Sequence, residues 1–344
     1  MNLKRFLPFF LDNLIWFLLM GVTLYFVFVA ENFLNKANFL NIFYNASVLG
    51  LLVIGQCFTL FTGNFDLSSE SVLGLCGLLG IWLMNAAGYP IYGSGYMLPI
   101  YVVVPIILLI GMAIGAFNGF MITRFKMNNF VQTLAMLITL RGITLIVNGG
   151  QTAYSKFPEY NFVGLHRIGN QIPIPVIILI VAFLIAHIVT TRTPFGREII
   201  AVGANRKAAL ASGVNPEMRI IQVYMISGLM AAFAGWVLSA RLTNAMSTLG
   251  KGMIFEVMAA SVIGGVSLQG GQGRIINALG GVLLLTIISA GLNMMDVNVF
   301  WVETIRGLII IIAMLIEAQR VRYIAPSVAA AAKPPAAVAS GSGD

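Results

Sequence analysis

Apolar residues occur along the chain in long continuous runs, separated by short polar connections. The runs are about 17–25 residues long, the length a helix needs to cross roughly 30 Å of hydrocarbon, and they lack the alternating polarity of a membrane β-barrel. Reading them between charges, glycines and prolines predicts spans at 14–30, 45–63, 70–87, 98–121, 128–147, 173–191, 220–240, 254–267, 275–294 and 301–317. The fold predicted is all-α: a polytopic transmembrane helical bundle of about ten spans, occupying residues 1–324.

The two ends of the chain depart from this pattern. Lys4 and Arg5 precede the first apolar run as they would in a signal peptide, but the run is long and no small-residue cleavage pattern follows it. We therefore expect a first span there. Residues 325–344 consist mostly of Ala, Pro, Gly and Ser, a composition too poor in large apolar groups to fold. We expect a disordered cytoplasmic tail.

One connection, residues 192–219, is long, polar and basic. Asn205 is a good N-cap, and Gly213 is a suitable residue to stop a helix. The sequence between them predicts a two-turn helix on the membrane surface that a partner protein could contact. The residues assigned to that contact are Asn205, Arg206, Lys207, Ala208, Ala209 and Gly213.

Two spans are interrupted by similar polar segments, at 62–69 and 263–273. Each contains Gly, then an apolar residue, then a polar-Leu-polar triplet, which suggests an internal repeat. Non-helical backbone at membrane depth is tolerated only where it is buried in protein or lines a cavity. Asn64, Asp66, Ser68, Ser267 and Gln269 are therefore candidates for lining a substrate path. A capped turn at the membrane edge explains the same residues.

Other polar residues lie inside apolar runs. They are Gln56, Asn118, Gln132, Thr133, Arg141, Glu256, Asn277, Asn293 and Arg306. Because a charge near the bilayer centre costs about 2.5–3.5 kcal/mol, these groups should face the bundle interior and be paired. We add Gln56, Asn118 and Glu256 to the candidate path. A structural ion pair or a contact at a helix end is the alternative for Arg141 and Glu256.

Small residues recur at helical spacing in several spans, which predicts close packing of helix backbones. The sets are Gly111, Gly115 and Gly119; Gly228, Ala231, Ala232 and Gly235; and Gly280, Gly281 and Gly291.

Composition agrees with a membrane protein: of 344 residues, 59% are hydrophobic and only 9% are charged. The net charge of +8 is scattered at the ends of apolar runs, so it does not indicate nucleic-acid binding. Cys57 and Cys76 lie within apolar runs without metal-ligand spacing, and the glycine clusters lack the lysine of a nucleotide-binding loop. We expect no metal, no cofactor and no catalytic centre in this chain.

The basic residues also predict orientation through the positive-inside rule. With the N-terminus inside, the cytoplasmic segments collect Lys4, Arg5, Arg124, Lys126, Arg192, Arg197, Arg206, Lys207, Arg219, Arg274, Arg320 and Arg322. The other side collects Lys36, Lys156, Arg167, Arg241 and Lys251. Both termini and the 192–219 connection are therefore predicted to be cytoplasmic.

The main external loops are then 149–172 and 241–252. They combine aromatic and basic residues, of which Tyr154, Lys156, Tyr160, Arg241 and Lys251 are candidates for docking an external protein. An interfacial aromatic belt accounts equally well for the aromatic residues.

Four sequence elements resemble the ribose-type ABC transporter permeases, bacterial importers of monosaccharides and related polyols. These elements are TPFGREIIAVGANRKAALASGV with YMISGLMAAFAG, GNFDLSSESVLGL, FEVMAASVIGGVSLQGGQG and NNFVQTLAMLITLRGI. Together they cover about residues 45–315. Asn64 and Phe65 stand where the family has Gly-Ile, Ser69 and Glu70 where it has Val-Gly, and Lys207 where importer permeases usually have Glu.

The resemblance implies a permease subunit in the bacterial inner membrane, without catalytic activity. It implies as partners a second permease chain, cytoplasmic ATPase subunits that use ATP and Mg, and a periplasmic substrate-binding protein. An ion-coupled secondary transporter is the alternative, although such proteins normally need a titratable or cation-binding centre at mid-membrane. A membrane-embedded enzyme is disfavoured, because His166 and His187 stand alone.

Overall fold

The computed structural model describes residues 13–88 and 92–298 and, beyond them, 300–302, 304–309, 311–312 and 315. Its named helices are α2 (Leu14–Val29), α3 (Lys36–Phe61), α4 (Ser69–Met84), α5 (Ile100–Arg124), α6 (Asn129–Val147), α7 (Pro158–Leu165), α8 (Ile174–Arg192), α9 (Pro194–Ala204), α10 (Arg206–Ala211), α11 (Pro216–Leu242), α12 (Met253–Ile263) and α13 (Ile275–Met294). Four two-residue strands form two antiparallel pairs. β1 (Ala153–Tyr154) pairs with β4 (Asn244–Ala245), and β2 (Arg167–Ile168) pairs with β3 (Ile172–Pro173).

Six of the described helices are long and apolar enough to cross a membrane: α3, α5, α6, α8, α11 and α13. The apolar helices α2, α4 and α12 are shorter. With 11 residues, α12 is about 16 Å long, half the thickness of the hydrocarbon core. A helical membrane protein is confirmed, whereas the predicted count of ten spans is not. The range 301–317 is described only in part, and the tail 325–344 lies outside the described residues.

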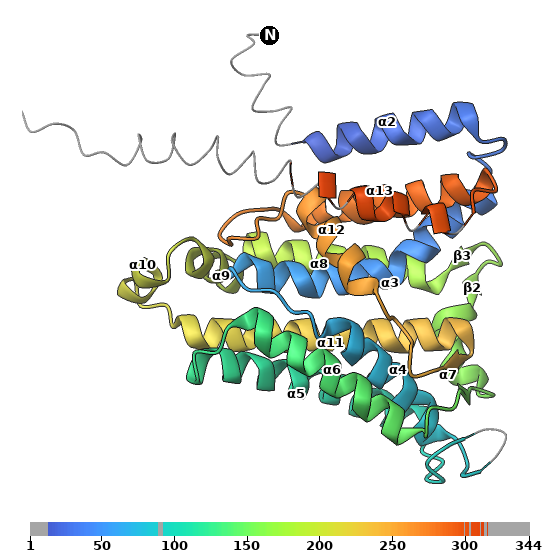
Figure 1. Ribbon diagram of the computed structural model, residues 1–344, viewed down its shortest axis with the longest axis horizontal. Helices are drawn as coiled ribbons and strands as arrows, with labels where there is room; N and C mark the ends of the chain where they lie inside the picture. The colour runs from blue at the N-terminus through green and yellow to red at the C-terminus, as the bar shows by residue number, and fades with distance from the viewer. Residues whose placement is uncertain are drawn as a thin grey trace, which may run out of the picture.

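The long helices lie side by side, with connections gathered at two opposite ends (Figure 1). One end carries α9 and α10 and is called the α10 end here. The other carries α7 and the β2–β3 pair and is called the α7 end. In Figure 1 the connection from α11 to α12 runs from the α7 end back into the middle of the bundle, where α12 begins.

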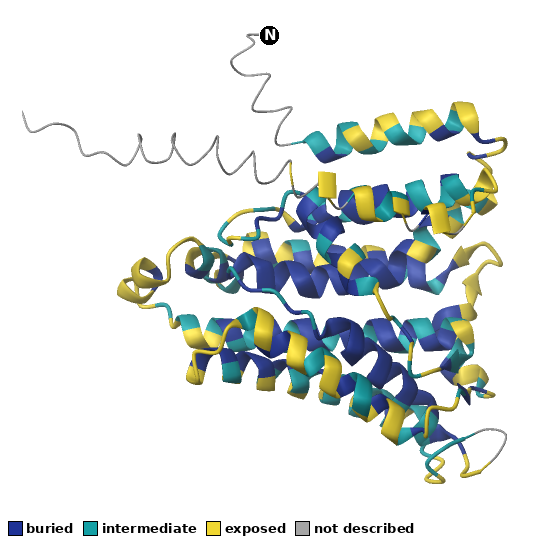
Figure 2. Cartoon of the chain, in the orientation of Figure 1, coloured by how far each residue is buried: buried dark blue, intermediate teal, exposed yellow. Residues whose placement is uncertain are grey.

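Buried residues concentrate in α3, α4 and α11, which form the centre of the bundle (Figure 2). Small residues allow this packing. A Cβ added at Gly111 would overlap the carbonyl of Gly228, and one at Gly115 would overlap that of Tyr224. The predicted close packing of helix backbones is therefore confirmed for α5 against α11.

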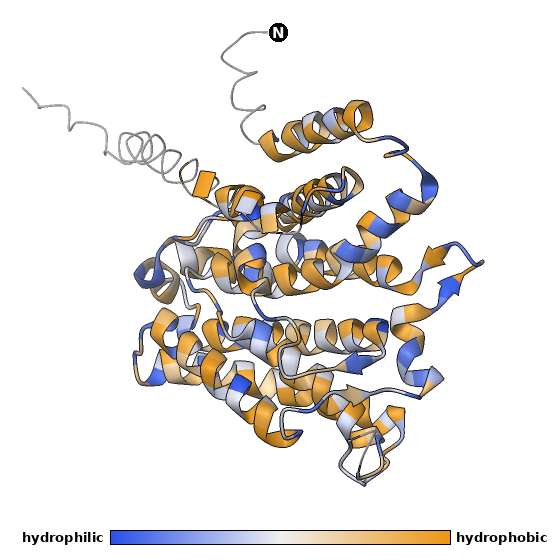
Figure 3. Cartoon of the chain, turned by 45° about the vertical axis from the view of Figure 1, so that its right-hand side comes forward, coloured by the Kyte–Doolittle hydropathy of each residue, from blue (hydrophilic) through white to orange (hydrophobic). Residues whose placement is uncertain are grey.

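Large apolar side chains cover the outer faces of several helices, and hydrophobic colour dominates the helix bodies in Figure 3. On α8, Ile180, Leu184 and Ile188 are all exposed, and on α6, Ile138 and Ile146 are exposed. Such a surface suits contact with lipid or with another apolar chain.

Candidate functional site

The first interrupted segment leaves α3 at the α10 end and returns to the centre of the bundle. Gly63 turns the chain with a φ of 73°, a backbone conformation that glycine adopts without strain. Asp66 then accepts a hydrogen bond from the Ser227 hydroxyl at 2.8 Å, and Ser227 lies near the middle of the 27-residue α11. The segment 62–68 is thus re-entrant, and α4 begins near mid-depth.

A buried polar network surrounds Asp66. Its carboxylate accepts from the backbone N–H and the hydroxyl of Ser68 at 2.9 and 2.6 Å. The Asn118 amide donates to the Ser68 hydroxyl at 2.9 Å, and the Gln132 amide donates to Asn118 at 3.2 Å. The structure therefore brings together three predicted path residues, Asp66, Ser68 and Asn118. All three are fully enclosed, so in this conformation they join α4, α5, α6 and α11 instead of lining an open path.

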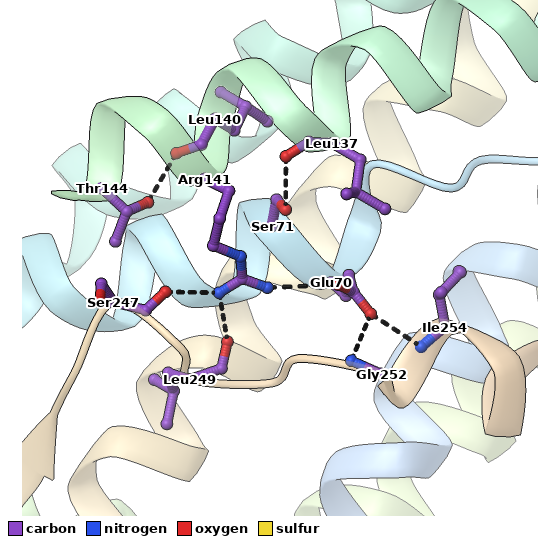
Figure 4. A network of polar contacts seen from close by, with 10 residues as sticks. All are labelled: Glu70, Ser71, Leu137, Leu140, Arg141, Thr144, Ser247, Leu249, Gly252 and Ile254. Carbon is purple, nitrogen blue, oxygen red and sulfur yellow. Dashed lines mark hydrogen bonds and ion pairs between the residues drawn. The ribbon is translucent and has the colours of Figure 1, made fainter.

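A second re-entrant segment leads from α11 to α12 and is held by an ion pair (Figure 4). The Arg141 guanidinium lies 3.3 Å from the Glu70 carboxylate and donates to the carbonyls of Ser247 and Leu249 at 2.7 and 3.0 Å. Residues 247–252 are thereby held against the start of α4. The prediction that 241–252 is wholly an external loop was wrong, since only its first residues lie at the α7 end.

The starts of α4 and α12 meet at this ion pair. Glu70, in the first turn of α4, accepts backbone hydrogen bonds from Gly252 and Ile254 at 2.9 and 3.3 Å. A carboxylate is stabilised at a helix N-terminus by the helix dipole and by the unpaired N–H groups there. The ion-pair alternative weighed for Arg141 is therefore the one observed, with Glu70 as its partner.

The second interruption, after α12, contacts the first at the α10 end. The Gly271 N–H donates to the Phe61 carbonyl at 3.0 Å, and a Cβ at Gly63 would lie 2.9 Å from the Gln269 carbonyl oxygen. Of the predicted path residues here, Ser267 is buried and Gln269 is exposed. Both belong to this junction between the two interrupted segments.

A cleft of about 880 Å³ opens at the α10 end beside α10. It is lined by residues of the first interruption, of the α5–α6 connection and of the segment from α10 to α11. Asn64 lies at its inner wall, where its side-chain oxygen accepts from Asn129 at 3.3 Å and from Arg206 at 3.4 Å. The α10 helix is thus joined directly to the re-entrant segment.

The predicted surface helix is present as α10. The Asn205 side chain accepts hydrogen bonds from the N–H groups of Lys207 and Ala208 at 3.0 and 3.1 Å, which confirms the predicted cap. Gly213 follows the helix with a φ of 85°. A preceding helix, α9, was not predicted, although Thr193 caps it and the apolar spacing of Ile199 and Val202 buries one face.

One of the residues that the sequence assigned to partner contact, Ala209, was assigned wrongly. Ala209 is the one buried residue of α10 and only 4% exposed, so it is unavailable to a docking protein. Arg206, Lys207 and Leu210 are exposed instead and border the α10 cleft, and Leu210 is 63% exposed. An exposed leucine on a capped polar helix was the signal that sequence reasoning missed.

A polar cavity of about 310 Å³ lies between α3, α12, α13 and the described residues after 300. Across it, the Arg306 guanidinium pairs with Glu256 at 3.0 Å and donates to the Ser289 hydroxyl at 3.1 Å. Asn45 and Asn293 line the part nearer the α7 end. Glu256 therefore forms the ion pair that was weighed for it, and it also lines this cavity.

Gln56, the remaining predicted path residue, is fully buried on α3. Its amide nitrogen lies 3.2 Å from the Met258 sulfur of α12, and its buried oxygen lacks a hydrogen-bond partner in the described part of the chain. It lies in the α3–α12 packing and does not line the polar cavity.

The residues predicted to dock an external protein separate into two groups. Tyr154 and Lys156 are exposed at the α7 end. Tyr160 was wrongly included: it is fully buried, and its hydroxyl lies 2.7 Å from that of Ser239. Burial raises the pKa of Tyr160 above its ordinary value, and the hydrogen bond with Ser239 opposes the shift.

Two basic residues of that prediction also occupy unexpected positions. Arg241 is half-buried, with its guanidinium 4.0 Å from the centre of the Tyr44 ring and hydrogen-bonded to Asn45. Lys251 is exposed but directly precedes Gly252, so it lies beside Glu70 and away from the α7 end. Arg241 therefore lies at the α7 end but is engaged by α3, whereas Lys251 does not belong to that end.

Among the residues that the structure describes, no group of three His, Cys, Asp or Glu side chains could hold a metal ion. Cys57 and Cys76 are both free and buried. The polar groups of interest in the described chain gather in the buried network around Asp66, in the α10 cleft and in the polar cavity.

Comparison with known proteins identifies the family to which the chain belongs. Residues 38–314 match the family described as branched-chain amino acid transport system, permease component. The ribose import permease protein of Bacillus subtilis is 36% identical over 296 residues, covering 84% of this chain and 87% of that protein. The D-allose transport system permease protein of Escherichia coli is 34% identical over 291 residues, covering 83% and 85%.

A further relative, the galactose/methyl galactoside import permease protein of Haemophilus influenzae, is 31% identical over 321 residues and covers 89% of this chain and 94% of its own. No solved structure matches. The chain belongs to this family of transporter permeases, and its resemblance to ribose-type ABC permeases is confirmed. It is a multi-pass membrane protein.

Proposed function

We propose that this chain is the membrane-spanning subunit of an ATP-driven importer for a monosaccharide or a similar small polyhydroxylated solute. Relatives named for the import of ribose, allose and galactose support the substrate class. The chain itself binds no cofactor and catalyses no reaction. ATP and Mg are used by a partner ATPase subunit, and a periplasmic binding protein delivers the solute.

The capped helix α10 is the observation that carries this proposal. It projects from one end of the bundle (Figure 1), presents Arg206, Lys207 and Leu210 to the outside, and is joined through Arg206 to Asn64 of a re-entrant segment. A small exposed helix with an apolar tip suits insertion into a cleft of an ATPase. Its movement would pass directly to the interrupted helices.

Orientation follows from the basic residues. Arg124, Lys126, Arg206, Lys207 and Arg274 all belong to segments at the α10 end. The positive-inside rule then makes this end cytoplasmic and the α7 end periplasmic. Tyr154 and Lys156 become part of the landing surface for the binding protein.

A second permease chain is supported by the position of Lys251. This lysine is exposed on the side of the bundle near mid-depth, next to the ion pair of Glu70. A charge facing lipid at that depth would cost about 2.5–3.5 kcal/mol. We therefore place a second chain, and the aqueous path between the two, against the face that carries Lys251 and the exposed Phe255.

The alternative, an ion-coupled transporter, needs a deep acidic group that exchanges its partner for an ion. The described deep acids are otherwise engaged: Asp66 by two serine hydroxyls, and Glu70 and Glu256 by arginines. These contacts favour the importer.

Association with an ATPase tests the proposal. In the purified complex, Leu210→Glu should lower the amount of co-purified ATPase subunit and the ATP hydrolysis measured without binding protein. Leu242→Glu is the matched control, because Leu242 is also exposed but lies at the α7 end. Equal loss in both variants, or in neither, would remove α10 from the ATPase contact.

A further inference from the structure

The polar cavity differs in composition from the apolar groove on the other side of α3. A groove of about 450 Å³ between α3, α8 and α11 is lined by Ile, Phe, Val, Ala and Met side chains alone, as expected of a lipid-facing surface. The polar cavity instead carries two amides, two hydroxyls, a carboxylate and a guanidinium. These come from Asn45, Glu256, Thr286, Ser289, Asn293 and Arg306.

This set of groups matches a neutral polyhydroxylated solute. The amides donate and accept hydrogen bonds, the carboxylate accepts and the guanidinium donates, and each sugar hydroxyl does both. The hydroxyls of Thr286 and Ser289 donate to the carbonyls of Val282 and Leu285, so toward a sugar they act as acceptors. The charges of Glu256 and Arg306 cancel within their ion pair, so neither an anion nor a cation is preferred. Leu49, Met253 and Leu285 supply an apolar wall for the C–H faces of a ring.

The size and position of the cavity also fit a solute in transit. Its volume of about 310 Å³ is at the lower end of the range of roughly 300–1,000 Å³ typical of small-molecule sites. Asn45 lies beside Tyr44, whose hydroxyl donates to the Gly164 carbonyl of α7, so one side of the cavity is at the α7 end. Glu256 lies in the first turn of α12, beside the re-entrant segments, so the other side reaches mid-depth.

We propose that this cavity is a sugar-binding site within the permease itself, in which Glu256, Ser289, Asn293 and Arg306 recognise the hydroxyl groups of a monosaccharide released at the α7 end. The inference rests on the proposed function and adds to it a binding site in this chain. Arg241, which is hydrogen-bonded to Asn45, is a positioning residue that orients the Asn45 amide at the rim.

A first experiment fills the cavity. Proteoliposomes containing the permease with its ATPase and binding protein are assayed for uptake of radiolabelled D-ribose, D-allose and D-galactose. Ala290→Phe places a ring in the cavity and should lower kcat/KM for uptake about tenfold or more, with basal ATP hydrolysis unchanged. Ala182→Phe makes the same substitution in the apolar groove and should leave uptake within about twofold of wild type.

A second experiment detects occupancy without relying on activity. Asn293→Cys is introduced after Cys57 and Cys76 are replaced by alanine, and its reaction with a small water-soluble thiol reagent is timed. Binding protein loaded with the imported sugar should slow this reaction several-fold more than unloaded binding protein. Met246→Cys, exposed in the α11–α12 connection and outside the cavity, should react equally in both cases.

The outcomes separate the two proposals. If wild-type proteoliposomes import one of the sugars while sugar has no effect on labelling of Asn293→Cys, the cavity assignment is overturned and the importer stands. If Ala290→Phe and Ala182→Phe impair uptake equally, the assignment of the cavity as a sugar site is also overturned. If ATP drives import of none of the three sugars, the proposed substrate class is refuted, and the proposed sugar site is refuted with it.

Discussion

Replacing Arg141 tests whether the ion pair at the start of α4 and α12 holds the re-entrant segment in place. The side chains of Arg141 and Glu70 are 17% and 6% exposed. Arg141→Met keeps the unbranched stem of the side chain but removes the ion pair and the hydrogen bonds to the carbonyls of Ser247 and Leu249. The substitution also leaves the Glu70 carboxylate buried without its cation.

The expected loss follows from these contacts. A hydrogen bond to a charged group contributes about 1.5–3 kcal/mol, and breaking a buried ion pair costs about 3–5 kcal/mol. Glu70 keeps the backbone N–H groups of Gly252 and Ile254, which offsets part of that cost. We therefore expect the free energy of unfolding to fall by about 3 kcal/mol, or Tm by roughly 6–12 °C.

The chain provides its own reporter for this measurement. Cys57 and Cys76 are free and buried, so a fluorogenic thiol reagent reacts as the protein unfolds. Arg124→Met is the control, because Arg124 is exposed at the end of α5, and its Tm should stay within about 2 °C of wild type. An equal Tm for Arg141→Met and wild type would refute the role given to the ion pair.

Two further predictions use the same assay. Gly115→Ala should lose about 1–3 kcal/mol, because its Cβ would overlap the Tyr224 carbonyl, whereas Gly142→Ala, with open space around it, should be neutral or slightly stabilising; equal effects would contradict the α5–α11 packing. Asp66→Ala should destabilise more than Asp66→Asn, because only the alanine leaves the hydroxyls of Ser68 and Ser227 without any acceptor; the reverse order would contradict the network.

Features specified by nearby residues were predictable from the sequence. The Asn205 cap is such a feature, since it depends on amides two and three residues away. The small residues of α5 and α11 were equally informative, because only small side chains permit that approach. A charge in an apolar run also predicts pairing, but its partner does not follow: Glu70 and Arg141 are 71 positions apart.

Features that depend on contacts between residues far apart in the sequence were missed or assigned to the wrong place. Tyr160 lies in a loop rich in aromatic residues, a composition typical of an interfacial aromatic belt. Its hydroxyl is nevertheless hydrogen-bonded to the hydroxyl of Ser239 inside the bundle. Lys251 was read as external because a short polar connection usually lies at a membrane surface. Its connection instead re-enters the bundle, held by Arg141 and Glu70, and no local signal distinguishes the two cases.

Uptake in a reconstituted system distinguishes an ATP-driven importer from an ion-coupled transporter. Proteoliposomes holding the permease, its ATPase and sugar-loaded binding protein should accumulate D-ribose, D-allose or D-galactose only when ATP and Mg are supplied on the α10 side. Vanadate should abolish the uptake, and an uncoupler should leave it unchanged. Accumulation that proceeds without ATP and collapses with the uncoupler would exclude an ATP-driven importer and identify an ion-coupled transporter.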